Sequence, residues 1–164
     1  ARATARRSVI PQKHQDRTPV HTLFPAPHPD LDPLPPLRTP TDRGPMTLTT
    51  RAVGAYGERV ALRHLIESGM TPVARNWTCP EGEVDLILSD GDDLVFCEVK
   101  TRRSIAFGAP AEAVGPRKQR RLRTLATRWL AGTPAHDAHV RFDVVAVTAR
   151  PRGAASVEHV RGAF

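Results

Sequence analysis

Cysteine, lysine and long apolar runs are scarce in this chain of 164 residues, and each scarcity narrows what the protein can be. The two cysteines, Cys79 and Cys97, lack the spacing of a metal-binding motif, and such a pair suits a reducing cytoplasm. Because no run of about 18 apolar residues occurs, no membrane-spanning helix is expected. The early arginines are not followed by the apolar core of a secretory signal.

Arginine supplies nearly all of the positive charge. Of the 24 basic residues only three are lysines, namely Lys13, Lys100 and Lys118, and the net charge is +7. GC-rich codons also favour arginine, so the charge alone does not establish a nucleic-acid partner. A basic domain nevertheless accommodates phosphate groups well.

The first 45 residues differ in composition from the rest. Ten of the 16 prolines lie between Pro11 and Pro45, and periodic apolar residues are few. We therefore expect residues 1–45 to be a disordered tail, either a linker or a functional basic tail. Met46 opens the stretch before the first helical pattern, so residues 1–45 could instead come from an over-extended reading frame. Peptides from this segment in the native protein would refute that hypothesis.

Residues 46–164 predict a mixed α/β or α+β domain. Helices are expected over residues 51–68 and from Gly115-Pro116 to Gly132. Strands are expected over residues 72–77, 83–88, 94–100, 140–147 and 157–160. The order is α-β-β-β-α-β-β, which predicts a central sheet with helices packed on it.

The first predicted helix carries a carboxylate on the side meant for the core. At 100° per residue its apolar stripe comprises Gly54, Glu58, Ala61, Leu62, Leu65 and Ile66. A lone glutamate in such a stripe is usually a satisfied edge residue. Glu58 therefore indicates a functional site only if other charged side chains lie close to it.

Charges also interrupt the two strands that flank the turn SDGDD. Glu98 and Lys100 share a strand face with Phe96, where an unpaired charge is costly to bury. Mutual pairing, a metal or an open cleft at the strand end would compensate. Asp85 interrupts the preceding strand, and a hairpin closed at SDGDD brings it near Glu98. Two adjacent carboxylates repel, and a divalent cation removes that conflict, with oxygen ligands favouring Mg²⁺ or Mn²⁺ over zinc.

Five short segments carry a family resemblance: YGER (56–59), GEVDLI (82–87), FCEVKTR (96–102), AVGPRKQRRL (113–122) and RFDVVAV (141–147). The spacing of Asp85, Glu98 and Lys100 resembles the metal-dependent nuclease pattern written PD-(D/E)XK. The five segments together resemble more closely the YraN-type family of predicted endonucleases, considered distant relatives of archaeal Holliday-junction resolvases. The resemblance spans residues 50–164. It implies a restriction-endonuclease-like core, DNA as the substrate and Mg²⁺ (or Mn²⁺) as the cofactor.

The same resemblance implies catalytic roles for individual residues. Asp85 and Glu98 would bind the metal, with the carbonyl of Val99 as a further ligand. Lys100 would serve the attacking water or the transition state, and Glu58 would extend the metal site.

The sequence leaves open the role of Glu83, which precedes Asp85 by two residues. Many nucleases of the wider group have proline immediately before the aspartate, where this chain has Val84. Glu83 is either an additional acid or a charge at the strand end.

Candidate contacts to a DNA backbone follow the strand and open the second helix: Arg102, Arg103, Lys118, Gln119 and Arg121. The arginines could equally form a solvated basic surface, whereas Lys118 and Gln119 lie on the side of the helix that faces the sheet. Nothing predicts the reading of base edges, so only shape or backbone recognition is implied. Asp143 is interpreted as a structural residue paired with an arginine on the sheet.

The sequence thus favours a Mg²⁺-dependent DNA endonuclease of the cytoplasm. The alternatives are a non-catalytic nucleic-acid-binding module with a nuclease-like fold, and an interaction partner of DNA-processing machinery. A homodimer is compatible with the sequence. The oligomeric state and the preferred DNA structure stay open.

Overall fold

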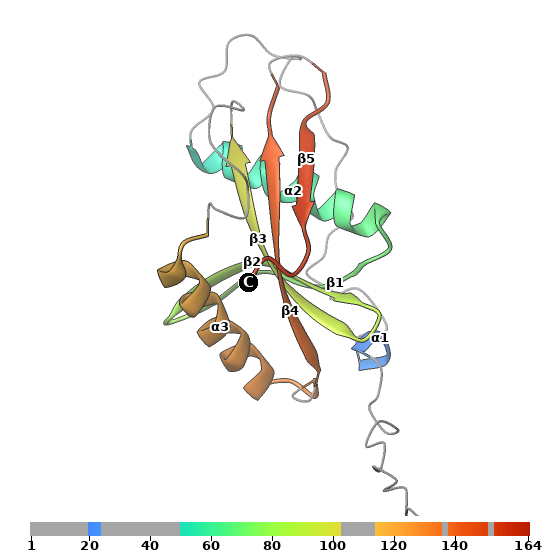
Figure 1. The fold of residues 1–164 in the computed structure, drawn as a ribbon, viewed down its shortest axis with the longest axis vertical. Coiled ribbons are helices and arrows are strands. Elements are labelled where there is room, and N and C mark those ends of the chain that lie inside the picture. The colour runs from blue at the N-terminus through green and yellow to red at the C-terminus, as the bar shows by residue number, and fades with distance from the viewer. Residues whose placement is uncertain (1–19, 24–49, 103–113, 136–137, 151–152) are drawn as a thin grey trace, which may run out of the picture.

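A mixed sheet of five strands forms the centre of the domain (Figure 1). The computed structural model describes residues 20–23, 50–102, 114–135, 138–150 and 153–164. Its elements are α1 (Val20–Leu23), α2 (Thr50–Glu67), β1 (Thr71–Cys79), β2 (Gly82–Asp90), β3 (Asp93–Arg102), α3 (Pro116–Ala131), β4 (His139–Thr148) and β5 (Ser156–Val160). Neighbouring strands follow chain order and are antiparallel, except that β3 and β4 are parallel. The predicted α/β class and element order are confirmed.

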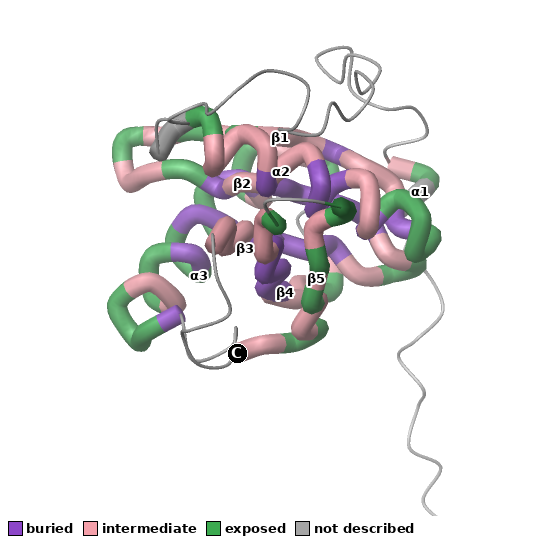
Figure 2. Tube along the Cα trace, turned by 90° about the horizontal axis from the view of Figure 1, so that it is seen from above, coloured by how far each residue is buried: buried purple, intermediate pink, exposed green. Residues whose placement is uncertain are grey.

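The two long helices cover opposite faces of this sheet. Along β3, Leu94 and Phe96 pack in one apolar cluster with α3, while Val95 and Cys97 pack in another with α2. Burial on both faces explains why β3 is apolar without alternation. Figure 2 shows the buried residues along the strands and on the inner sides of the helices. No helix within the described ranges is long and apolar enough to cross a membrane.

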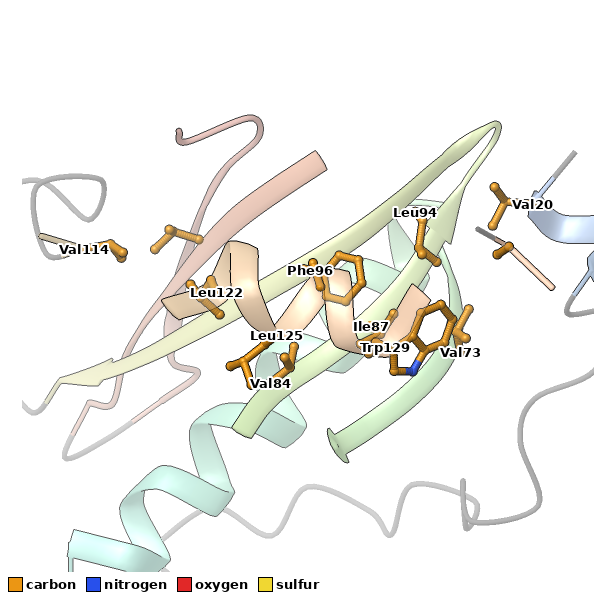
Figure 3. Packing of buried hydrophobic residues seen from close by; sticks show 13 residues of the cluster. Val20, Val73, Val84, Ile87, Leu94, Phe96, Val114, Leu122, Leu125 and Trp129 are labelled. Carbon is orange, nitrogen blue, oxygen red and sulfur yellow. The ribbon is translucent and has the colours of Figure 1, made fainter. Parts of the chain in front are cut away.

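Helix α3 packs on the sheet through apolar side chains at helical spacing. Its buried side chains are Leu122, Leu125, Ala126 and Trp129. The Trp129 ring stands edge-on to Phe96, with 5.9 Å between the ring centroids, and Figure 3 shows both rings within this cluster. Pro116 lies in the first turn and Gly132 follows the last helical residue, as predicted. The apolar side of α3 therefore fixes how the helix lies on the sheet.

Helix α2 contacts the sheet along a stripe that differs from the predicted one. Three residues of the expected stripe are buried: Ala61, Leu62 and Leu65. Ile66 is 39% exposed, so its predicted place in the core is wrong. The reason is the close crossing of α2 over β3, where a Cβ on Gly57 would lie 1.8 Å from Oγ1 of Thr101. This contact turns Gly57 toward the sheet and Ile66 away from it.

Four residues of the predicted tail lie within the described part of the chain. They form α1, and Val20 is only 2% exposed because it packs in the α3-side cluster with Leu94 (Figure 3). A buried valine supplies apolar contact that offsets the entropy of ordering so short a segment. The tail assignment for residues 1–19 and 24–45, and the suggested start at Met46, lie outside the described residues and stay predictions.

A network of ion pairs closes the end of the sheet where β2 turns into β3. Arg141 of β4 lies at its centre and donates to Asp143, Asp90 and Asp93 at 3.0, 2.8 and 2.5 Å. Asp143 is completely buried and lies 2.8 Å from Nε2 of His159. The interpretation of Asp143 as the structural partner of an arginine is confirmed.

The buried carboxylate of Asp143 is held in its charged form. Burial raises its pKa, but hydrogen bonds from His159, Arg141 and the backbone N–H of Gly162 outweigh burial and lower the pKa to about 2. The ordinary value for this group is 3.8. A lowered folded-state pKa means that the charged carboxylate stabilises the fold above pH ~4 and loses this effect as the pH falls toward 2.

Asp143→Asn is expected to lower the free energy of unfolding at pH 7 by about 2 kcal/mol, because it removes the charge that pairs with Arg141 and accepts the surrounding hydrogen bonds. It should also flatten the decline of stability between about pH 4 and pH 2. Urea unfolding across this range measures both effects. Asp92→Asn is the control, since Asp92 is exposed in the turn between β2 and β3 and has no ion-pair partner among the described residues. Equal stability of the two variants would contradict the assignment.

Candidate active site

The antiparallel pairing of β2 with β3 stops just before the predicted acidic site. The last paired residues are Leu86 and Cys97. One position further, the carboxylate of Asp85 accepts a hydrogen bond of 2.7 Å from the backbone N–H of Val99. A side chain thus takes the place of a strand carbonyl, and β2 and β3 separate beyond it.

Glu98 lies in this opening with its carboxylate almost entirely buried. Its side chain is only 3% exposed, and Oε1 receives both Lys100 Nζ at 2.8 Å and Lys118 Nζ at 2.7 Å. Its other oxygen, Oε2, is buried without a hydrogen-bond partner in the described structure. An unsatisfied buried oxygen costs about 1–3 kcal/mol. Oε1 of Glu98 therefore has two ammonium partners, whereas the buried Oε2 has none among the described residues and could accept a ligand.

Asp85 and Glu98 lie close enough to influence one another. Burial and the negative charge of Glu98 raise the pKa of Asp85 to about 6, against the hydrogen bond from Val99. The predicted convergence of the two carboxylates at the open end of the hairpin is thus present. Lys118 partly offsets their repulsion.

The two lysines come from different elements. Lys100 lies on β3, two residues beyond Glu98, and Lys118 lies in the first turn of α3. They are the only lysines in residues 46–164, and both contact the same carboxylate oxygen. The ammonium group of lysine is a compact point charge. Two ammonium groups can therefore approach one carboxylate oxygen more readily than two planar guanidinium groups can.

Glu58 lies at the margin of this group. The crossing at Gly57 brings α2 against the end of β3, and the charge of Glu58 further raises the pKa of Asp85. Glu58 Oε1 nevertheless lies back along its own helix, 3.9 Å from where a Cβ on Gly54 would stand. In the parts of the chain that the structure describes, no three Asp, Glu, His or Cys side chains form a ready-made metal cluster. The structure therefore gathers Asp85 and Glu98 and leaves Glu58 outside the pair.

The predicted DNA contacts separate into different roles. Gln119 Nε2 donates to the carbonyl of Val114 at 2.9 Å, and Arg121 Nε donates to the carbonyl of Glu81 at 3.1 Å. Both side chains thus donate hydrogen bonds to backbone carbonyls of the protein itself. Lys118 belongs to the carboxylate site.

Three further predictions have different outcomes. The backbone carbonyl of Arg102 accepts from Ala149 at 2.8 Å. Arg103 lies outside the described residues. Glu83 is exposed, as a charge at a strand end would be.

Two structural contributions were missed from the sequence. Gly57 sets the approach of α2, and the signal for it was a glycine inside a helical pattern, which usually has a packing reason. The direct contact of Lys118 with Glu98 was missed because Lys118 was assigned to the DNA backbone. The scarcity of lysine was the signal that could have singled it out.

Comparison with known proteins covers the segment that holds these residues. The profile of the uncharacterised protein family UPF0102 matches residues 57–147. The chain belongs to this family. A UPF0102 protein of Beutenbergia cavernae is 60% identical over 111 residues, which are 68% of this chain and 94% of the relative. One from Kineococcus radiotolerans is 57% identical over 112 residues, covering 68% and 92%.

Membership in UPF0102 confirms the YraN-type resemblance at the family level. A Nocardioides relative, again named only a UPF0102 protein, is 50% identical over 112 residues, covering 68% of this chain and 90% of the relative. The family match begins at Gly57 and ends at Val147, so it includes Asp85, both lysines and Glu98. The site therefore lies within the part of the chain that UPF0102 proteins share.

Asp85→Asn is expected to stabilise the cation-free protein at pH 7 by about 1–2 kcal/mol, because it removes a buried charge beside Glu98 and keeps an acceptor for Val99. The raised pKa of Asp85 means that its ionisation opposes folding. As the pH rises from about 4 to about 6, the free energy of unfolding of the wild type should therefore fall relative to that of the variant.

Urea unfolding in EDTA tests this expectation. Glu83→Gln, an exposed change two residues earlier on β2, is the control and should alter stability little. A loss of stability in Asp85→Asn would contradict the account.

Proposed function

We propose that this UPF0102 protein is a metal-dependent DNA endonuclease that hydrolyses phosphodiester bonds. The observation that carries the proposal is the grouping of Asp85, Glu98 and Lys100 at the point where β2 and β3 separate. A buried and a half-buried carboxylate that repel one another are costly in a sheet, and their grouping with an adjacent ammonium is typical of a functional site.

The donor set fits a Mg²⁺ or Mn²⁺ ion. Glu98 Oε2 is a buried oxygen without a partner, and Asp85 presents a second carboxylate beside it. Magnesium in proteins is often held by one or two carboxylates, water and substrate phosphate, so a cluster of three acidic side chains is not required. Asp85, Glu98 and the carbonyl of Val99 would hold the ion, and Glu58 would extend the site once substrate is bound. When bound, the ion supplies Lewis-acid polarisation of a phosphoryl oxygen.

The lysines have complementary tasks in this proposal. Lys100 and Lys118 both bind Oε1 of Glu98, which favours the charged carboxylate and leaves Oε2 for the cation. Lys100 also orients the attacking water and stabilises the negative charge that develops on the phosphoryl group. Hydrolysis forms a bond between the water oxygen and phosphorus and breaks one ester P–O bond.

The substrate assignment rests on charge and on the resemblance. The basic chain suits a polyanion, and Lys118, Arg102 and Arg103 are among the proposed backbone contacts. The resemblance to junction resolvases makes branched or otherwise structured DNA the substrate to test first. Cytoplasmic location is part of the same proposal.

Purified protein with branched, flapped and linear DNA, in Mg²⁺, Mn²⁺ or EDTA, tests the function. We expect nicking that requires the cation. Lys100→Met and Glu98→Gln should each lower the single-turnover rate by at least about 100-fold, because each removes a group that acts on the reacting phosphate or its cation. Glu83→Gln is the control and should keep the wild-type rate.

Two outcomes would overturn the proposal. Undiminished cleavage by folded Lys100→Met and Glu98→Gln would reject the roles assigned to these residues. Salt-sensitive DNA binding without cleavage in any cation would instead identify a non-catalytic nucleic-acid-binding module.

A further inference from the structure

Helix α3 has an unusual distribution of charge on its outer side. Its sequence PRKQRRLRTLATRWLA contains no acidic residue. Its six basic residues are Arg117, Lys118, Arg120, Arg121, Arg123 and Arg128. Like charges three or four residues apart on a helix repel one another unless they have acidic partners. The contacts of each basic side chain therefore show which cations are neutralised within the protein.

Three of the arginines are engaged within the protein. Arg121 and Arg128 both contact Glu81 in the turn between β1 and β2. Nη2 of Arg128 lies 2.7 Å from the carboxylate of Glu81. Arg123 lies over the ring of Phe164, with 5.2 Å from its Cζ to the ring centroid. These contacts fasten α3 to the rest of the domain along both flanks.

Arg117 and Arg120 differ from these three. Both are exposed, and neither has an ion-pair or hydrogen-bond partner for its guanidinium group among the described residues. They are three residues apart, so about one helical turn with a rise of about 4.5 Å separates them. They form a free pair of cations on the solvent side of the first two turns.

The position of this pair relative to the site is fixed by Lys118. That residue follows Arg117 directly, and its ammonium lies 2.7 Å from Glu98. The first turn of α3 is therefore anchored to the carboxylate that would bind the cation, while its outer side presents Arg117 and then Arg120 to solvent. A polyanion that reaches Glu98 has these two cations on the α3 side of the site.

We propose that Arg117 and Arg120 form a phosphate-binding surface on α3, which receives the DNA backbone next to the reacting phosphodiester. This inference rests on the proposed function for its substrate. Gln119 and Arg121 each donate a hydrogen bond to the protein's own backbone, whereas Arg117 and Arg120, one or two residues away, would take the phosphates. Guanidinium groups bind phosphate oxygens in a bidentate manner without reading bases, so the surface favours binding without sequence preference.

The test compares two double variants that remove the same charge from opposite sides of the sheet. Arg117→Gln/Arg120→Gln removes the proposed surface. Arg63→Gln/Arg75→Gln is the matched control, with two arginines that have no partner among the described residues. Arg63 lies on α2, and Arg75 pairs with Leu86, which packs in the α2-side cluster. Fluorescence anisotropy with duplex and branched DNA in EDTA measures binding without cleavage.

We expect the α3 double variant to bind at least about tenfold more weakly at moderate salt. The slope of log K against log salt should fall in magnitude by about 1.8, which corresponds to two phosphate contacts at about 0.9 each. The control should change affinity less than about threefold and keep the wild-type slope. Circular dichroism and urea midpoints verify that both variants fold.

Unchanged binding by the α3 double variant would overturn the inference, and so would an equal loss in both double variants, which would mean that only net charge matters. The outcome is separable from that of the catalytic proposal. Weakened binding by the α3 variant, in a wild-type protein that cleaves nothing, keeps this surface and rejects the nuclease. Cation-dependent cleavage with unaltered binding by the α3 variant keeps the nuclease and rejects this surface.

Discussion

The carboxylate of Glu98 lies where an apolar sheet would ordinarily exclude charge, and two ammonium groups keep it there. Lys100 reaches it along β3, and Lys118 reaches it from α3 across the sheet face. This pairing ties the two elements together at one atom, Oε1. Removal of either lysine would leave a buried negative charge with less compensation, which costs several kcal/mol in general. The contact of Lys118 with Glu98 thus adds to the apolar packing of α3 and ties the first turn of the helix to the end of β3.

Two carboxylate sites, about one residue step apart along β3 and β4, use buried charge in opposite ways. Around Asp143, an arginine, a histidine and a backbone N–H satisfy the carboxylate, and its pKa falls to about 2 despite burial. Around Asp85, burial and a second carboxylate raise the pKa to about 6, and Glu98 keeps an oxygen without a partner. A satisfied network rigidifies a fold, whereas an incompletely satisfied one marks a place where a ligand would lower the energy. This contrast supports the proposal that the Asp85–Glu98 pair, and not the Asp143 network, binds a ligand.

Much of this arrangement could be predicted because it depends on local periodicity. The order of helices and strands followed from apolar runs and turns, and the SDGDD turn set the register that brings Asp85 toward Glu98. The apolar spacing of α3 likewise indicated which side meets the sheet. Each of these features is decided by residues within a few positions of one another.

The errors arose where contacts between distant elements decide the outcome. Ile66 is exposed because Gly57 meets Thr101, a contact that periodicity along α2 cannot reveal. The hydrogen bond from Arg121 to the carbonyl of Glu81 was likewise not predicted, because the two residues lie 40 positions apart in the chain. Charge patterns show that cations are present, and only the fold shows which of them are free.

A crystal of the protein grown with Mn²⁺ tests the central claim most directly, because the anomalous signal of manganese locates the ion without assuming activity. The account predicts an anomalous peak in contact with Glu98 Oε2 and an Asp85 oxygen, which disappears in Glu98→Gln crystals grown in the same way. A manganese ion bound elsewhere, or an unoccupied Glu98 at saturating Mn²⁺, would contradict the assignment of these carboxylates as a metal site.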